Sequence, residues 1–357
     1  MNSQTRIFTP GPVKIPAYVL EAGAVQTPYF RNAEFSAVLL ECEQYLLAFS
    51  GAPEGSRVVF LTASGSGAME AAVANLLAPQ EPVIVINGGG FGQRFADIAT
   101  HCRLDVRQYL VERDRLPAAA DFVKLLPATA LLVNAHETTT GVLYDLHALA
   151  GFCRDTRALF IVDAISMFLT DPLDMTALGI DALIVSSQKG LALPPGLSMV
   201  ILSPRAQSRL CSGNAPYYFN FSSYLDNGAR GQTPFTPSVT IILQLLVRLR
   251  RIAELGLGAE FDRASNVASR FRQAVPRWPL AFFSRFMPNA MTALSPTDGS
   301  KAGDIVAILE SRYNICVAPN GGALHDTVFR VSHMGDQYES DIDYLIDAFD
   351  DYYGVAA

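Results

Sequence analysis

The sequence lacks any long uncharged hydrophobic run, although 50% of its residues are hydrophobic. A membrane-spanning helix needs about 18 to 20 consecutive apolar residues, and no stretch of the 357-residue chain meets that requirement. The first residues, Met-Asn-Ser-Gln-Thr-Arg-Ile-Phe, also lack the basic segment and the apolar segment of a signal peptide. We therefore expect no membrane partner and a cytoplasmic location.

Cysteine pairs at metal-binding spacing are absent as well. The five cysteines are scattered and none belongs to a Cys-x-x-Cys motif, which argues against a zinc site and predicts no bound metal. Concentrated basic charge is equally scarce, because the net charge is −7 and the densest basic cluster is only Arg248-Leu-Arg-Arg251. A nucleic-acid partner is therefore not expected.

Short apolar runs alternate with helical segments through the first two thirds of the chain. Near-continuous apolar strands separated by helices predict a mostly parallel sheet with helices on both faces, a three-layer α/β/α domain. Ligands of such sheets bind beyond the carboxyl ends of the strands. The predicted strands cover residues 57–62, 83–87, 130–134, 159–163, 182–186 and 199–203.

The C-terminal part has a different texture. A long helical pattern runs over about 241–266, and shorter strands and helices then predict a smaller α+β domain. The predicted strands are 290–294, 315–318 and 328–332, and the predicted helices are 304–312 and 340–352. We divide the chain into an N-terminal arm (1–35), a large domain (36–260) and a small domain (261–357).

A lysine stands at the exit of one apolar run. Residues 182–186 are apolar or small, Lys189 follows them, and Gly190 and Pro194 then break the chain into a loop. An ammonium group is costly to bury, so its pKa should fall, and a neutral amine can condense with a carbonyl or an aldehyde cofactor. On position alone, the alternative is a surface lysine in a turn.

An aspartate closes another run. Asp163 follows the apolar residues 159–162, where a carboxylate is costly unless it meets a cation. A protonated pyridine nitrogen would be such a cation, and the pairing would make the ring an electron sink. A helix cap or a structural ion pair is the alternative.

Two glycine-rich turns follow other strands. Ser64-Gly-Ser-Gly-Ala-Met-Glu70 lies between a strand and a helix, where backbone amides and Ser66 could receive a phosphate. Asn87-Gly-Gly-Gly-Phe-Gly-Gln-Arg94 sets Phe91 among glycines, so that its ring could lie flat on another ring. Taken singly, the first turn could be an ordinary tight turn and Phe91 a core residue.

Two further features supply polar groups. His136-Glu-Thr-Thr-Thr-Gly141 offers hydroxyls after a strand, either for a ligand or for capping the next helix. Arg330 lies in the alternating strand 328–332. A half-buried arginine needs a carboxylate, which could belong to a substrate or to a structural salt bridge.

Taken together, these motifs resemble those of the class V pyridoxal-phosphate aminotransferases of fold type I, in the same order along nearly the whole chain. The segments that carry the resemblance are Thr9-Pro-Gly-Pro12, Gly65-Ser-Gly67, Asn87 to Arg94, Glu137-Thr-Thr-Thr-Gly141, Asp163-Ala, Ser187-Gln-Lys189, Pro194-Pro-Gly196 and Phe329-Arg330. Glu137-Thr-Thr-Thr-Gly141 resembles the 2-aminoethylphosphonate:pyruvate transaminases, whereas Ser187-Gln-Lys189 and Pro194-Pro-Gly196 resemble the alanine or serine:glyoxylate enzymes.

The resemblance implies a role for each matching residue. Lys189 would hold pyridoxal 5'-phosphate as a Schiff base and move the substrate proton, and Asp163 would pair with the pyridinium. Arg330 would hold the substrate carboxylate. The remaining contacts to the cofactor would be Phe91 on the ring, Thr138 at the phenolic oxygen, and Ser66, Gly67, Ala68 and Gln188 around the phosphate.

The resemblance also implies a homodimer with a shared active site. Thr233, in Arg230-Gly-Gln-Thr233, would complete the phosphate site of the partner subunit. We further hypothesise that Arg31, in the aromatic arm, binds a second anionic group of the substrate, and an ion pair that anchors the arm is the alternative. Relatives often carry tyrosine in place of Arg230 and tryptophan in place of Phe91.

The predicted function is transamination from a small amino donor, of the alanine, serine or 2-aminoethylphosphonate type, to pyruvate or glyoxylate. The first alternative is a pyridoxal-phosphate lyase or desulfurase on the same fold, but Cys316 lies in a predicted buried strand and does not suit a mobile nucleophile. A nicotinamide oxidoreductase would need the full glycine fingerprint and the acidic residue after it, both of which are missing. A non-catalytic binding protein is the last alternative, and the presence of both Lys189 and Asp163 argues against it.

Overall fold

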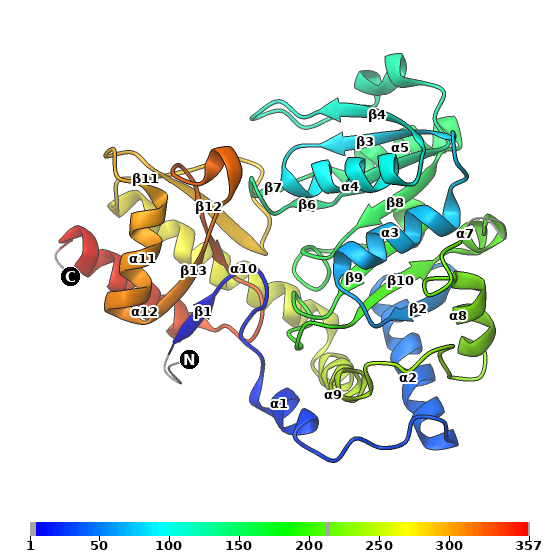
Figure 1. The fold of residues 1–357 in the computed structure, drawn as a ribbon. Helices are drawn as coiled ribbons and strands as arrows, with labels where there is room; N and C mark the ends of the chain where they lie inside the picture. The colour runs from blue at the N-terminus through cyan, green and yellow to red at the C-terminus, as the bar shows by residue number, and fades with distance from the viewer. Residues whose placement is uncertain (1–4, 211–214, 356–357) are drawn as a thin grey trace.

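The computed structural model describes residues 5–210 and 215–355. A seven-stranded sheet lies at the centre of the larger half, with the strand order β2-β10-β9-β8-β5-β3-β4 (Figure 1). Its strands are β2 (Arg57–Leu61), β3 (Pro82–Asn87), β4 (Asp105–Leu110), β5 (Ala130–Asn134), β8 (Leu159–Asp163), β9 (Ala182–Ser186) and β10 (Ser198–Leu202). β10 runs antiparallel to its two neighbours, β2 and β9, whereas the other neighbouring strands pair in parallel. The predicted mostly parallel sheet is therefore confirmed.

Both faces of this sheet are buried, because alternate residues of a strand point to opposite sides. In β3, Ile84 and Ile86 pack into one hydrophobic core, whereas Val83 and Val85 pack into another. Helices cover the two faces and give three layers. They are α2 (Ala33–Phe49), α3 (Gly65–Leu76), α4 (Gly90–His101), α5 (Leu146–Thr156), α6 (Met175–Leu178), α7 (Pro204–Ser208), α8 (Phe221–Gly228) and α9 (Val239–Leu255).

A five-stranded sheet, in the order β1-β13-β14-β12-β11, forms the smaller half. Its strands are β1 (Arg6–Phe8), β11 (Leu280–Phe282), β12 (Met291–Pro296), β13 (Ile315–Pro319) and β14 (Phe329–Ser332), and its helices are α10 (Leu257–Ala274), α11 (Ala302–Tyr313) and α12 (Glu339–Tyr353). The N-terminal β1 pairs with β13. The first segment of the chain therefore crosses to the small half before α1 (Ala17–Gly23) leads it to the large one.

The predicted continuous helix over 241–266 is wrong. The structure has α9 and α10 in its place, separated by Gly256 with a φ of 85°. A residue in this region of φ cannot continue a right-handed helix, and glycine adopts it without a steric penalty. The domain division at residues 35 and 260 stays a prediction. In residues 5–210 and 215–355, no helix is both long and apolar enough to span a bilayer.

Candidate active site

Three polar side chains gather where neighbouring strands of the large sheet end. Asn134 ends β5, Asp163 ends β8, and Lys189 follows β9. The strands are adjacent and parallel, and their register places Asn134 opposite Asp163 and Asp163 opposite Ile184. The sheet therefore brings the predicted amine and the predicted carboxylate to the carboxyl ends of its strands, which is where such sheets bind ligands.

Lys189 is buried beneath the N-terminal segment. Its Nζ donates a hydrogen bond to the carbonyl oxygen of Pro10. Gly11 lies so close that a Cβ at this position would stand 2.8 Å from Lys189 Cδ. Burial, reinforced by the positive charge of Arg330, lowers the pKa of Lys189 from 10.5 to about 8. The amine can therefore lose its proton near neutral pH, which a nucleophilic role requires.

Asp163 is also buried, and neutral groups hold its carboxylate. Oδ2 accepts a hydrogen bond of 2.7 Å from Asn134 Nδ2, and Oδ1 accepts one of 2.9 Å from the Ile165 amide. Burial raises the pKa of Asp163 from 3.8 to about 6, although these two hydrogen bonds oppose the shift. No ion pair to Asp163 occurs within the described ranges, so the carboxylate is available to a ligand cation.

The first turn of α3 lies beside these groups. Gly65 packs against the Ile165 side chain, two residues after Asp163. Ser66 Oγ accepts a hydrogen bond of 2.9 Å from Arg94 Nη1. The amides at the start of a helix attract anions, and Arg94 adds a positive charge. Gln188, the remaining same-chain residue predicted around a phosphate, accepts a hydrogen bond of 2.7 Å from Ser186 Oγ.

Phe91 lies at the start of α4, and a buried glutamate ties this turn to the Thr138 loop. Glu137 accepts hydrogen bonds from the amides of Gly92, at 2.9 Å, and Thr139, at 3.0 Å. The guanidinium carbon of Arg94 stands 5.0 Å from the centre of the Phe91 ring. Glu137 belongs to the motif at 136–141, but the sequence predicted no function for it. The structure shows that it joins two predicted binding segments.

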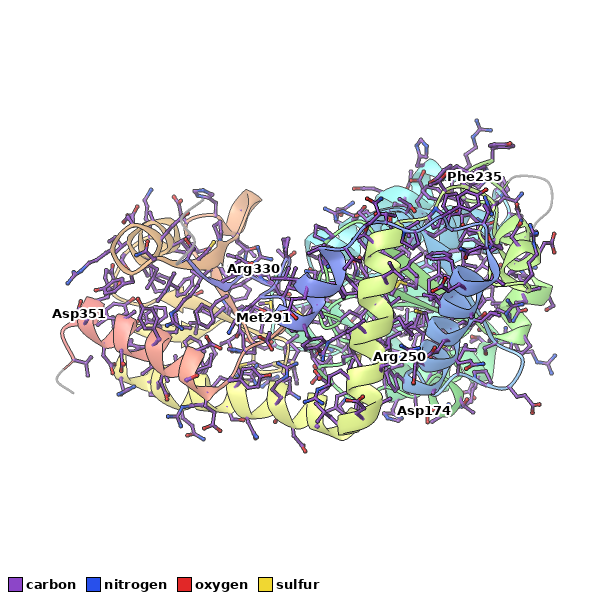
Figure 2. All side chains as sticks on the ribbon, turned by 90° about the horizontal axis from the view of Figure 1, so that it is seen from below. Asp174, Phe235, Arg250, Met291, Arg330 and Asp351 are labelled. Atoms are coloured by element: carbon purple, nitrogen blue, oxygen red, sulfur yellow. The ribbon has the colours of Figure 1, made fainter. Side chains whose placement is uncertain are left out.

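Arg330 and Thr138 lie side by side, although they come from different halves of the molecule. Arg330 Nη1 donates to the Thr138 carbonyl at 3.3 Å, and Nη2 donates to the Pro319 carbonyl at 2.6 Å. Its Nε is buried without a hydrogen-bond partner among the described residues. Thr138 Oγ1 lies 3.0 Å from Ser166 Oγ. Figure 2 shows Arg330 between the two halves of the molecule.

Thr233 and Arg31 form a separate group. Arg31 Nη1 donates to the Thr233 carbonyl at 2.6 Å. Arg31 lines an open groove of about 550 Å³, and Thr233 directly precedes Pro234, which also lines it. Arg31 and Arg230 contribute positive charge to the groove, whose lining residues are Arg31, Tyr217, Asn220, Ser223, Asn227, Arg230, Pro234 and Phe235. In Figure 2 the labelled Phe235 lies well apart from Arg330. No hydrogen bond within 5–210 and 215–355 joins Arg31 or Thr233 to Lys189 or Asp163.

The residues at the strand ends fit pyridoxal phosphate. The aldehyde of this cofactor needs an amine that can be neutral, which Lys189 offers. Its pyridinium needs a carboxylate free of other cations, which Asp163 offers. Its phosphate needs donors and positive charge, which the start of α3 and Arg94 provide.

Comparisons with known proteins find one matching family and relatives that align with nearly the whole chain. The sequence model of the family described as "Aminotransferase class-V" matches residues 17–322. The chain is 31% identical to the soluble hydrogenase 42 kDa subunit of Anabaena cylindrica, over 96% of this chain and 91% of the relative. It is 30% identical to the L-aspartate–glyoxylate aminotransferase of Paracoccus denitrificans, over 94% and 87%. The structure of an aspartate aminotransferase from Thermus thermophilus matches with a TM-score of 0.92 and 29% identity, over 98% of this chain and 99% of the other.

Proposed function

Because the chain belongs to the class V aminotransferase family and is a pyridoxal phosphate-dependent transaminase, we propose that it moves the amino group of a small donor to pyruvate or glyoxylate. The candidate donors are alanine, serine, aspartate and 2-aminoethylphosphonate. Relatives named for aspartate, serine and alanine share glyoxylate in their names, and this supports glyoxylate as the first acceptor to test.

Pyridoxal phosphate supplies an aldehyde that takes up the donor's amino group and a ring that accepts the electrons left when the Cα proton departs. The observation that carries the proposal is the pair of buried groups, Lys189 and Asp163, at neighbouring strand ends. Lys189 would hold the cofactor and then carry the proton from and to the substrate carbon, since its pKa near 8 allows both protonation states at working pH.

Asp163 would keep the ring nitrogen protonated, and the Arg330 guanidinium would bind the substrate carboxylate. Phe91 would limit the movement of the ring from one side. Thr138 would donate its hydroxyl proton at the phenolic oxygen of the cofactor, a role that its position beside Ser166 supports. The phosphate would be bound by Ser66, Gly67, Ala68 and Gln188 at the start of α3.

We also propose a homodimer in which Thr233 serves the partner's phosphate site. Arg31 is held by the backbone of residues 233 and 234, so it would enter the partner's site together with Thr233. A groove lined by two arginines, and by no acidic side chain among the described residues, suits a second anionic group of the donor, such as a distal carboxylate or a phosphonate.

The spectrum of the bound cofactor tests the proposed reaction. The purified protein is reconstituted with pyridoxal phosphate and mixed with one donor at a time: L-alanine, L-serine, L-aspartate and 2-aminoethylphosphonate. We expect at least one donor to convert the cofactor fully to its pyridoxamine form, and glyoxylate or pyruvate to reverse the change. The Lys189→Ala variant should show no such conversion on the time scale of the wild type.

Other outcomes identify the rival reactions. A donor that is consumed while the cofactor keeps its aldehyde form would indicate a lyase. Release of sulfur from cysteine would indicate a desulfurase. The structure gives the latter little support, because Cys316 lies in β13 and burial raises the pKa of its thiol, which lowers the reactive thiolate fraction.

A further inference from the structure

A single side chain supports the carboxylate of Asp163. Asn134 ends the strand next to it, and its Nδ2 donates to Asp163 Oδ2 at 2.7 Å. The other oxygen, Oδ1, receives the Ile165 amide at 2.9 Å. Each carboxylate oxygen thus has one donor from the protein and keeps free lone pairs. The Ile165 donor is part of the main chain, whereas the Asn134 donor depends on the residue type.

Burying the Asn134 amide costs free energy. Its side chain is 1% exposed, and its Oδ1 has no hydrogen-bond partner in the part of the chain that the structure describes. An unpaired buried acceptor destabilises a fold. The four residues before it, Ala-Leu-Leu-Val, are all apolar and buried, so an apolar residue would continue the strand without this cost. The amide is therefore unfavourable for packing, and its one strong contact is with Asp163.

We propose that Asn134 is a positioning residue for the cofactor: it keeps the Asp163 carboxylate ionised and turned toward the ring nitrogen of pyridoxal phosphate. The inference rests on the role proposed above for Asp163. A carboxylate that loses a hydrogen bond in a buried site is easier to protonate. A protonated carboxyl group no longer forms an ion pair with the pyridinium, and the ring then accepts electrons less well.

The charges around Asp163 make this contact important. Lys189 stabilises the carboxylate, while Glu137 opposes it, and burial outweighs both. Lys189 would be bound covalently to the cofactor aldehyde, so its free ammonium group cannot supply lasting support. The Ile165 amide and Asn134 remain in either state of the site. Of these two groups, only Asn134 can be removed by substitution without changing the backbone.

The test measures cofactor affinity. Apoprotein of the wild type and of Asn134→Leu is titrated at pH 7.5 with pyridoxal phosphate and with its analogue in which CH replaces the ring nitrogen. We expect the variant to bind pyridoxal phosphate about 10- to 100-fold more weakly, the usual range for a hydrogen bond to a charged group. It should bind the analogue as the wild type does, because that ring makes no ion pair with Asp163.

Gln244→Leu is the matched control. Gln244 is another buried amide: its Nε2 donates to the Val19 carbonyl at 2.9 Å, and its Oε1 has no hydrogen-bond partner among the described residues. Its substitution should leave both affinities unchanged. Asn134→Ala repeats the test with a smaller side chain if the leucine does not fit.

The outcomes separate the inference from the proposed function. If the wild type binds neither compound, the proposed use of this site is wrong. If the wild type binds both and the Asn134 variants lose no affinity, or lose the same factor for both compounds, the positioning role of Asn134 is refuted. Selective loss of pyridoxal phosphate affinity supports it. A pH titration of the holoprotein, followed by absorbance, should then show that the pyridine nitrogen of the bound cofactor loses its proton at a lower pH in the variant than in the wild type.

Discussion

The lowered pKa of Lys189 makes a prediction that can be tested without cofactor or substrate. Burial lowers this pKa first, and the positive charge of Arg330 lowers it further, to about 8. At pH 7 an amine with a pKa of 8 is neutral in about one molecule in eleven, against about one in 3,000 for an ordinary lysine. The reactive fraction of Lys189 should thus be about 300-fold larger than that of an unperturbed lysine.

Competitive acetylation measures this fraction. Apoprotein is treated with traces of acetic anhydride between pH 6 and 11, and the peptides are quantified by mass spectrometry. The reactivity of Lys189 should reach its midpoint near pH 8. Lys301 is the internal control, because it is exposed and its hydrogen bond to Asp326 raises its pKa above the ordinary value.

Arg330→Met provides the perturbation. Removing the guanidinium takes away a positive charge that disfavours the Lys189 ammonium, so the pKa of Lys189 should rise toward its ordinary value. The shape of the titration curve gives the pKa, so poor access of the reagent lowers the curve without moving its midpoint. A midpoint at pH 10 or above in the wild type would refute the reasoning, as would a midpoint that Arg330→Met leaves in place.

Two further predictions concern Asp163 and Arg31. Burial raises the pKa of Asp163 from 3.8 to about 6, so the folded state binds the proton more tightly and stability falls as pH rises through this window, by about 3 kcal/mol in total. Asp163→Asn should therefore raise the free energy of unfolding of the apoprotein at pH 7.5 by up to about 3 kcal/mol, and by less at pH 5. Urea denaturation measures both values, and an equal gain at the two pH values would contradict this prediction. Arg31→Ala subunits mixed with Lys189→Ala subunits should recover about a quarter of wild-type activity on L-aspartate, because half of the random dimers carry one complete site. No recovery would place Arg31 in its own subunit's site.

The parts of the fold that the sequence predicted share one property, which is that burial dictates their residue types. Residues 159–162 of β8 are apolar because both faces of the strand are covered, and such runs stand out. The strand β4 (Asp105–Leu110) was missed because it lies at the edge of the sheet. Its residues Asp-Val-Arg-Gln-Tyr-Leu are largely exposed or half-buried, so polar side chains interrupt the pattern. The break at Gly256 was missed because a single glycine does not interrupt the apolar periodicity of α9 and α10.

The site divides in the same way. The positions of Lys189 and Asp163 at the ends of neighbouring strands were predictable, because one follows and the other closes an apolar run, whereas their roles rest on the resemblance of the surrounding motifs. Asn134 ends an apolar run too, but the value of a neutral amide depends on the neighbouring strand, and strand pairing is visible only in the fold. The contacts of Glu137 with the start of α4 likewise join residues about 45 positions apart. A polar residue that ends a buried strand was the one signal available for Asn134.

The two shifted pKa values have a common origin that bears on why the site binds a charged ring. Lys189 and Asp163 have opposite charges and stabilise each other, yet burial moves both pKa values toward the neutral forms. Their mutual attraction is therefore weaker than the cost of removing both groups from water. A ligand that replaces the free ammonium of Lys189 by reacting with it, and brings a cation to Asp163, relieves both costs at once. A ligand with only one of these properties leaves one group buried and uncompensated, so the pair selects for an aldehyde and a pyridinium in the same molecule.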